Sequence, residues 1–492
     1  EIIVDNNGSD AKSIYKEVGS WKNGSEKGFS IGKRPYKNNT NPFRTGTFRE
    51  SQTDSRGRSQ LGWIPNIPED GDYAVYISYN ASEENTDEAS YTVHYSGCSK
   101  EFLVNQKIGG STWIYLGTFH FKEGIDSKDQ KVVLSSKSSV EGQRISADAV
   151  RFGGGMGVIE RNGKSSERPK YTEGARYWLQ YAGFPDSLVY SLNVNNDYND
   201  DYQSRGEWVN YLTGAPSGPN KDRTAKGLGI PIELSMAFHT DAGVTGNDNT
   251  IGTLMIYSIE DSDSSRVFPN GQSRFANRDF GDIMQTELVD NLRTKIDSTY
   301  RRRNLYNRMY SEAFRQNTPA LLLELLSHQN FSDMKHGLDP EYKFEVARSI
   351  YKSMAKYIAV QHGKEYVIQP LPVSHFSTKI NELGQFELKW KPVLDSLEAS
   401  AVPEGYIVYI KENEEGYDTG RFVKKTEFTL EKPKTGTLYS FKVEAVNKGG
   451  KSMPSEILSA GLSGKGKAPV MVVNAFTRIS GPSSISTGNF EG

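Results

Sequence analysis

Two residues that could carry chemistry, His239 and Glu324, stand out against apolar surroundings. His239 directly follows the apolar run 232–238, and Glu324 interrupts the nearly continuous apolar run 320–326. In open α/β sheets, ligands gather beyond the carboxyl ends of strands, so both side chains could face one crevice. An imidazole there can ligate a metal, and a carboxylate there can accept a proton during catalysis.

Each candidate also has a structural interpretation. His239 could be a hydrogen-bonded structural histidine, and Glu324 could form a buried salt bridge with Arg308 or Arg315, because an unpaired buried carboxylate is costly. Glu173 opens a predicted helix, where the macrodipole alone favours an acidic residue and Thr172 is suited to cap the helix.

Two further sets of residues suggest ligand binding. The stretch 195–201 is acidic and rich in oxygen ligands, but it lacks the glycine and terminal glutamate of an EF-hand, so we predict a solvated loop. Trp21, Trp63 and Trp113 could stack on sugar rings. Since most tryptophans of a β-sandwich lie in the core, we expect at least two of the three to be buried.

The elements that must position these residues fall into four regions. Residues 1–155 contain short strands separated by Gly, Asn and Asp turns, which predicts a β-sandwich. Residues 156–367 alternate helices (172–182, 275–296, 344–360) with strands (232–238, 320–326), which predicts an α/β fold with a mainly parallel sheet. Residues 368–465 again read as all-β, and residues 466–492 look like a tail or the start of a further domain.

The composition restricts the class of protein. The 492 residues carry a formal net charge of -2 and no basic block, so we expect no nucleic-acid partner. The single cysteine, Cys98, excludes an intramolecular disulfide and a CxxC metal site. No apolar run is long enough to span a bilayer. The chain opens at Glu1 without an initiator Met or signal peptide, so we expect a processed or excised piece.

The two all-β regions each contain a recognisable combination of segments. Those of the first region are 18–21, 63–79, 109–113 with 116–119, and 147–152. Those of the third region are Trp390, the Gly405-Tyr406 strand opening, the strand around 439–443, and 450–455. The first region resembles the golvesin/xanthan-lyase carbohydrate-binding-like domain, and the third resembles a fibronectin type III domain.

Three segments of the second region, 171–175, 235–242 and 318–325, occur in an order that resembles the zinc-dependent N-acetylmuramoyl-L-alanine amidase family. The resemblance implies a zinc cofactor. It implies that Glu173 and His239 are metal ligands, that Glu324 is the catalytic base, and that Arg205 and Asp241 could line the site. His328, four residues after Glu324, could also line the site or replace a ligand. Structural interpretations remain for two of these residues: Arg205 could bridge a helix to a loop, and His328 could be a loop residue. Asn330 and Asp333 suit the loop after the last segment.

One departure affects this implied site. The family's first metal histidine lies in a Gly-His-Gly-type turn, and the chain contains no such turn. We expect that the histidine either lies upstream of Glu1, with the β-sandwich inserted into the amidase domain, or has been lost.

The resemblance thus implies an exported zinc-dependent hydrolase that cleaves the N-acetylmuramoyl-L-alanine amide of peptidoglycan. The expected partner is peptidoglycan or another cell-surface glycan, at a periplasmic, cell-surface or secreted location. Two alternatives stay open. One is a non-catalytic glycan-binding or adhesion protein on a decayed amidase scaffold. The other is a xanthan-lyase-like polysaccharide-degrading protein.

Overall fold

The computed structural model forms two compact units. One comprises Glu1–Ile232 with Lys411–Thr419, and the other comprises Glu233–Ile410 with Gly420–Gly492. The structure describes residues 1–33, 40–154, 160–161, 164–165, 174–185, 196–214, 226–247, 249–464 and 470–471. Most of the expected tail, 466–492, therefore lies outside the described residues. Among the described residues, no helix is long and apolar enough to cross a membrane.

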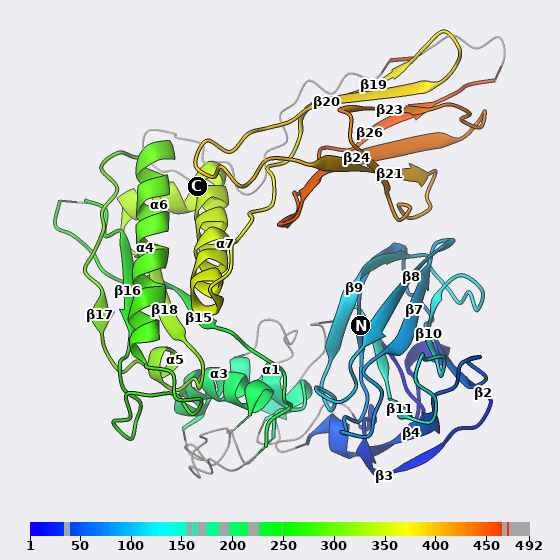
Figure 1. The fold of residues 1–492 in the computed structure, drawn as a ribbon, viewed down its shortest axis with the longest axis horizontal. Coiled ribbons are helices and arrows are strands. Elements are labelled where there is room, and N and C mark those ends of the chain that lie inside the picture. Colours follow the sequence, from blue (N-terminus) through cyan, green and yellow to red (C-terminus); the bar gives the residue numbers. More distant parts are fainter. Residues whose placement is uncertain are drawn as a thin grey trace. The chain divides into compact units, whose positions relative to one another are not determined.

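The first unit contains an N-terminal β-sandwich, as the sequence predicts (Figure 1). Its three sheets have the strand orders β1-β12-β6-β9, β2-β5-β10-β7-β8 and β11-β4-β3. The strands are β1 (Ile2–Val4), β2 (Ile14–Val18), β3 (Lys22–Gly28), β4 (Gly46–Gln52), β5 (Gln60–Ile64), β6 (Gly71–Ile77), β7 (Ala89–Tyr95), β8 (Cys98–Val104), β9 (Ile114–Phe121), β10 (Lys131–Ser135), β11 (Arg144–Ala147) and β12 (Val150–Phe152). Two short 3-10 helices, η1 (Asp10–Lys12) and η2 (Pro42–Arg44), and a small hairpin of β13 (Glu160–Arg161) and β14 (Lys164–Ser165) complete the β-rich part.

The sandwich core follows from the alternation of its strands. In β10, Val132 and Leu134 are fully buried while their neighbours are half-exposed, because successive side chains of a strand point to opposite faces. Trp63 is 0% exposed in the same core, and its indole N–H donates to the main-chain oxygen of Asp148 at 3.0 Å.

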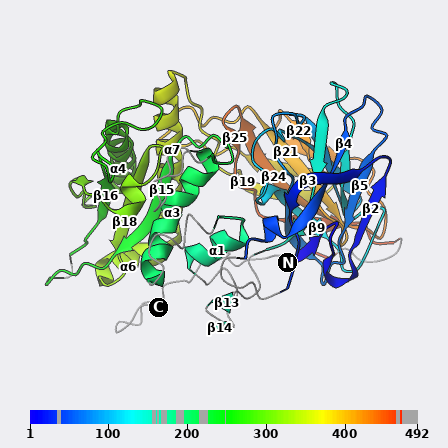
Figure 2. The same cartoon turned by 90° about the horizontal axis from the view of Figure 1, so that it is seen from below.

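Two helices of the first unit pack against each other, α1 (Ala175–Tyr181) and α3 (Asp197–Thr213) (Figure 2). The predicted loop at 195–201 is wrong for its described part, because the stretch from Asp197 onward is the first turn of α3. The side chain of Asn196 accepts a hydrogen bond from the Asn199 N–H at 3.1 Å, which satisfies one of the free donors at the helix start. Asparagine and aspartate suit a helix N-terminus as well as a loop, and this ambiguity explains the error.

The second unit begins with an α/β region, residues 233–362. Its sheet has the order β15-β18-β16-β17, from β15 (Ser235–Asp241), β18 (Ala320–Ser327), β16 (Thr253–Tyr257) and β17 (Tyr306–Asn307). The helices are α4 (Phe275–Lys295), α5 (Ser311–Phe314), α6 (Phe331–Leu338) and α7 (Pro340–His362). Pairs β15–β18 and β16–β17 are parallel, but β16–β18 is antiparallel, so the described sheet is mixed.

Helices α4 and α7 lie side by side and cover one face of this sheet (Figure 1). Both were predicted from their helical period, within a few residues of the observed ends. The side chain of Asp339 caps α7 by accepting from the Glu341 N–H, and Gly363 ends the helix with a φ of 58°. Capping at both ends fixes the length of α7.

The C-terminal sandwich completes the second unit. Its sheets have the orders β19-β20-β23 and β22-β21-β24-β25, with β26 paired to β24. The strands are β19 (Ser374–Ile380), β20 (Phe386–Lys391), β21 (Gly405–Glu412), β22 (Arg421–Val423), β23 (Glu427–Leu430), β24 (Leu438–Asn447), β25 (Gly450–Lys451) and β26 (Leu458–Gly461). The strict buried alternation of β24 places Phe441, Val443 and Ala445 at 0% exposure in the core.

Candidate functional site

The predicted pair, His239 and Glu324, is brought together at the carboxyl end of β15 and β18, where the two are direct register partners. Register partners on parallel strands project their side chains to the same face. Along β18, Leu323 and Leu325 join the core under α4 and α7, whereas Leu322 faces α5. The alternation therefore puts His239 and Glu324 together on the α5 face of the sheet.

A third residue, Glu312 of α5, completes this cluster. Its Oε2 lies 3.0 Å from Nε2 of His239, and its side chain is 12% exposed. This pairing gives His239 the polar partner that its structural interpretation requires. Glu312 could not be predicted from the sequence, because α5 has four residues and its apolar pair Ala313-Phe314 is too short to predict a helix.

The surroundings of Glu324 disfavour its ionised form. Its Oε2 is buried and accepts no hydrogen bond from the described residues. Burial raises the pKa of Glu324 above its ordinary value, and the nearby charge of Asp241 adds to the rise, while His239 and Arg303 oppose it. A carboxyl group with a raised pKa beside an imidazole is a common property of acid–base sites.

The alternative partners proposed for Glu324 are engaged elsewhere. Arg308 donates from Nη1 to the main-chain oxygen of Asn307 at 2.9 Å, and Arg315 donates from Nε to the hydroxyl of Ser311 at 2.8 Å. The described contacts therefore do not support a buried salt bridge, which is the structural alternative to a catalytic role for Glu324.

Two of the predicted lining residues lie at the same strand ends. Asp241 forms an ion pair of 2.6 Å with Arg303. Burial would raise the pKa of Asp241, but the hydrogen bond from Arg303 and those from main-chain amides lower it below its ordinary value. His328 places its Nδ1 3.1 Å from the hydroxyl of Thr240 and donates its main-chain N–H to the Asp241 oxygen.

The backbone at the end of β18 is strained and tightly held. Leu326 has a φ of 62°, in the left-handed region that a branched side chain rarely adopts. The carboxylate of Asp333, itself 0% exposed, accepts from the main-chain N–H groups of Ser327, Ile251 and Gly252. Asn330 caps α6 by accepting from the Asp333 N–H at 2.9 Å. Asp333 thus fixes the strand end that carries Glu324.

The remaining predicted site residues are not part of this cluster as described. Glu173 lies outside the described residues. Arg205 belongs to α3 of the first unit and pairs with Asp201 at 2.9 Å within its own helix. Within the described ranges, no group of three or more His, Cys, Asp or Glu side chains is arranged to hold a metal ion. The described part of the cluster alone does not fit the zinc site that the resemblance implies.

A second candidate site is a cleft of about 950 Å³ in the N-terminal sandwich. Residues from five separate stretches line it: Gly19, Ser20, Trp21, Lys22, Glu50, Ser51, Gln52, Thr53, Asp54, Arg58, Ser59, Glu84, Gly142 and Arg144. Of the three tryptophans, Trp63 is buried in the sandwich core, whereas Trp21 and Trp113 are half-buried and pack against apolar clusters. The expectation that at least two of them are buried is therefore met by Trp63 alone. Trp21 is half-buried and lies at the cleft.

The turn between β2 and β3 holds Trp21 in place. Gly19 has a φ of 85°, and a Cβ there would come within 2.6 Å of the Arg58 main-chain oxygen. Ser20 donates its N–H to the Ser59 hydroxyl at 3.1 Å, and the indole N–H of Trp21 donates to the Val18 oxygen at 3.1 Å. The turn therefore presents Trp21 in a defined orientation.

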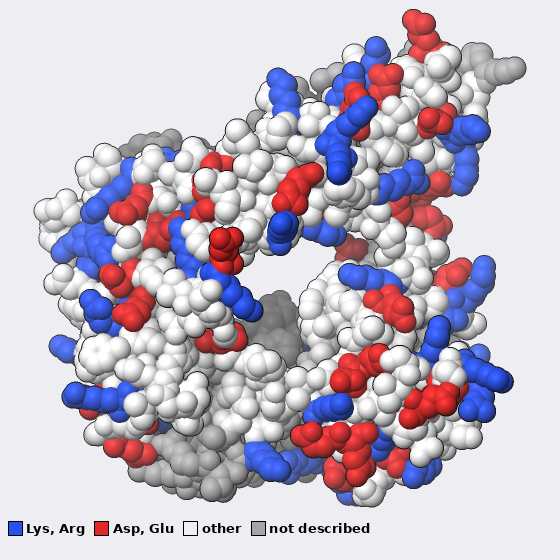
Figure 3. Space-filling model, in the orientation of Figure 1, with Lys and Arg blue, Asp and Glu red and all other residues white. Residues whose placement is uncertain are grey.

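The charged groups of the cleft are largely paired. Glu50 lies 3.1 Å from Lys22 and 3.5 Å from Arg144, and Arg58 lies 3.3 Å from Asp54. A hydrogen bond from Ser136 lowers the pKa of Asp54 to about 2. On the face of the molecule shown in Figure 3, positively and negatively charged side chains are likewise intermixed. The cleft thus offers both donors and acceptors without a dominant charge.

The N-terminal sandwich matches known proteins. Residues 2–154 match the family model of the Golvesin C-terminal domain. A xanthan lyase from Bacillus sp. (strain GL1) is 25% identical over 151 residues, which are 31% of this chain and 14% of the lyase. The structure of a Paenibacillus xanthan lyase matches 31% of this chain and 12% of that chain at 24% identity, with a TM-score of 0.25. The chain therefore corresponds to only a small part of either lyase.

The C-terminal sandwich also matches a family model. Residues 372–460 match the model of the Fibronectin type III domain. The N-acetylmuramoyl-L-alanine amidase from Clostridium difficile 630 matches 26% of this chain and 57% of that chain at 17% identity, and its TM-score of 0.20 carries no argument about function. Residues 2–154 and 372–460 are thus a Golvesin C-terminal domain and a fibronectin type III domain within one multidomain chain.

Proposed function

We propose that this chain is an exported glycan-binding protein and that its golvesin domain binds saccharide in the cleft beside Trp21. The carrying observation is the cleft itself, with a half-buried indole at a wall of paired charges and hydroxyls. Saccharide recognition uses apolar ring faces for stacking and many polar groups for hydroxyls. The match to the golvesin family and the similarity to xanthan lyase support a role with polysaccharides.

The test is a binding measurement on the full chain with soluble polysaccharides and peptidoglycan fragments. We expect Trp21→Ala to weaken binding about tenfold or more, which corresponds to ~1.4 kcal/mol. Tyr115→Ala is the matched control, because Tyr115 is an aromatic residue of the same sandwich that is 56% exposed and does not line the cleft. Equal binding by the Trp21 variant and the wild type would overturn this assignment.

Polysaccharide cleavage by the golvesin domain is not part of the proposal. The matched part amounts to 14% of the xanthan lyase, so the lyase activity of that protein does not carry over to this chain.

A second candidate function is zinc-dependent hydrolysis of the N-acetylmuramoyl-L-alanine amide in the α/β region. The observation that favours it is Glu324, a carboxyl group with a raised pKa whose buried Oε2 accepts no hydrogen bond from the described part of the chain and which lies beside His239. Zinc at such a site would supply Lewis-acid polarisation. Glu324 would accept a proton, and Arg303 would keep Asp241 ionised beside it. A complete ligand set requires Glu173 or other residues outside the described ranges.

Elemental analysis separates this candidate from the first. We expect about one zinc per chain in the purified protein, lost in His239→Ala and retained in Glu324→Gln, with amide cleavage of peptidoglycan fragments lost in both. Zinc-free protein that still binds glycan would remove the hydrolase candidate and leave the binding function intact.

A further inference from the structure

A stripe of basic residues runs along helix α7. Arg348, Lys352 and Lys356 are spaced four residues apart, so they lie on one face of the helix. Lys352 is 1% exposed and Arg348 is 8% exposed. Charged side chains this deeply buried require compensating partners.

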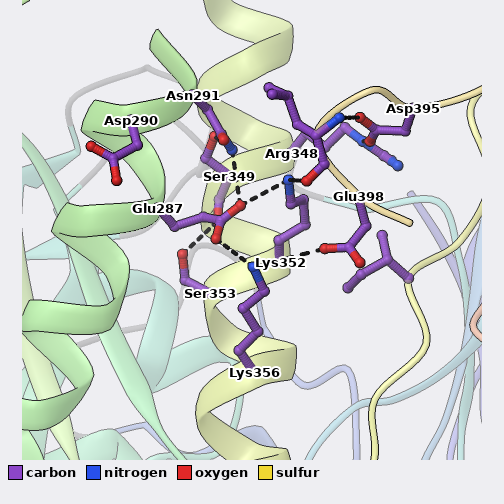
Figure 4. Close-up of polar contacts among 12 residues, drawn as sticks. Glu287, Asp290, Asn291, Arg348, Ser349, Lys352, Ser353, Lys356, Asp395 and Glu398 are labelled. Carbon is purple, nitrogen blue, oxygen red and sulfur yellow. Dashed lines mark hydrogen bonds and ion pairs between the residues drawn. The ribbon is translucent and has the colours of Figure 1, made fainter. Parts of the chain in front are cut away.

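Helix α4 supplies one of those partners. Oε1 of Glu287 lies 2.8 Å from Nζ of Lys352, and its Oε2 lies 2.5 Å from Nζ of Lys356 (Figure 4). Asn291, one turn along α4, donates to Glu287 Oε1 and to the Ser349 hydroxyl, each at 3.0 Å. Although burial would raise the pKa of Glu287, these hydrogen bonds lower it below its ordinary value.

The fibronectin domain supplies the other partners, through the loop 392–404 between β20 and β21. Oδ2 of Asp395 lies 2.7 Å from Nε of Arg348, and both side chains are less than 10% exposed. Glu398 lies 3.7 Å from Lys356, and Lys352 donates to the main-chain oxygen of Leu397 at 3.4 Å. Figure 4 shows these groups converging on one side of α7. Three acidic and three basic side chains therefore close a balanced network.

The segment that connects α7 to the fibronectin domain is held by hydrogen bonds to that domain and to Arg348. Ile368 is 0% exposed, its N–H donates to the Ser400 hydroxyl at 3.1 Å, and its oxygen accepts from the Asn447 side chain at 2.9 Å. The next residue, Gln369, accepts from Arg348 at 3.1 Å. A free interdomain linker would instead be exposed and make few contacts.

We infer that the fibronectin domain is not a flexible spacer. It packs firmly against the basic stripe of α7 and unfolds cooperatively with the α/β region. Separating the two would leave Arg348 and Lys352 without Asp395 and Leu397 and would disturb the buried, hydrogen-bonded segment at Ile368. Removing one partner of a buried ion pair is strongly destabilising, because it leaves the other charge buried and uncompensated. The interface thus couples the stability of α4 and α7 to that of the sandwich.

Hydrogen exchange with mass spectrometry on the full chain in increasing urea tests this coupling. We expect peptides from α7 and from β24 of the fibronectin domain to lose protection at the same urea concentration. Asp395→Asn, which keeps the shape of the loop, should lower both midpoints together by about 0.5 M or more. Lys352→Met, on the opposite side of the interface, should also lower the midpoint of β24.

Asp282→Asn on α4 is the matched control, since Asp282 forms an exposed ion pair with Arg302 outside the network, and it should shift neither midpoint. Separate midpoints for α7 and β24 in the wild type would overturn the inference. So would an Asp395 variant whose α7 peptides are unchanged.

Discussion

His239 and Glu324 are register partners on adjacent parallel strands, yet only one of the two carboxyl groups around them is well paired. His239 is paired with Glu312 at 3.0 Å, while Oε2 of Glu324 is buried without a hydrogen bond from the described residues. The fold therefore keeps the carboxyl group of Glu324 in an unfavourable environment, close to the carboxyl group of Glu312, which is paired with His239. Unfavourable polar burial at a strained strand end is typical of sites selected for function rather than stability.

Replacing Glu324 should therefore stabilise the protein. We expect Glu324→Leu to raise the free energy of unfolding at pH 8 by roughly 1 kcal/mol, because it removes a buried oxygen that has no hydrogen-bond partner among the described residues. The raised pKa fixes the sign: the folded state holds a proton that the unfolded state releases, so the wild type loses stability as pH rises above the ordinary glutamate range. Glu312→Leu is the comparison, and it should destabilise because it removes the ion pair between His239 and Glu312. Urea unfolding at pH 5 and pH 8 measures both, and a less stable Glu324→Leu at pH 8 would contradict the prediction.

Asp333 should be essential for the same strand end. Asp333→Ala removes the acceptor of three main-chain N–H groups, so we expect a loss of at least about 2 kcal/mol in urea unfolding. Asp290→Ala, an exposed carboxylate on α4, should change stability by less than about 0.5 kcal/mol. Similar midpoints for the two variants would show that the strand end does not depend on Asp333.

Much of the fold could be predicted because its elements carry strong periods. The apolar run of β18 and the helical spacing of α4 and α7 each gave an element within a few residues of its observed ends. Strand β15 was predicted at 232–238 but occupies Ser235–Asp241. The shift arises because its pairing with β18 begins where Ser235 meets Ala320, and tertiary register overrides local apolarity.

The sites were predictable only in part, since they assemble residues that are distant in sequence. The adjacency of His239 and Glu324 follows from the rule for strand ends, but Glu312 lies in a four-residue helix without a pattern. The cleft beside Trp21 is lined by five separate stretches, and the sequence pattern points only to the one that contains Trp21. The balanced network around Lys352 depends on a loop of another domain, which helical spacing on α7 does not reveal.

The turn that presents Trp21 should depend on Gly19. An alanine there would have to adopt a φ of 85° and place its Cβ within 2.7 Å of Ser59 Cα, so we expect Gly19→Ala to cost about 2 kcal/mol or more and to weaken glycan binding. Gly62→Ala is the control, because a Cβ at Gly62 meets nothing within 4 Å. Thermal unfolding measures the stability of both variants, and titration with glycan measures their binding. Normal glycan binding by a stable Gly19→Ala protein would contradict the proposed role of the turn.

The golvesin domain should lose stability as the solution becomes alkaline, because of Asp5 and Asp148. The two carboxyl groups are 2% and 3% exposed. Burial, together with the charge of Asp148, raises the pKa of Asp5 to about 8, and burial raises the pKa of Asp148 to about 7. Between the ordinary aspartate range and these values, the folded state binds more protons than the unfolded state, so the free energy of unfolding falls as pH rises from about 4 to 8.

Asp5→Asn should flatten this dependence, since the amide cannot ionise. We expect the wild-type golvesin domain, followed by hydrogen exchange of β5 and β10 peptides in urea, to be less stable at pH 9 than at pH 5 by at least about 2 kcal/mol, and the variant to lose clearly less. Asp87→Asn, at an exposed ion pair with Lys107, is the control and should keep the wild-type slope. Parallel pH profiles for the wild type and Asp5→Asn would show that the buried pair is not the source of the alkaline loss.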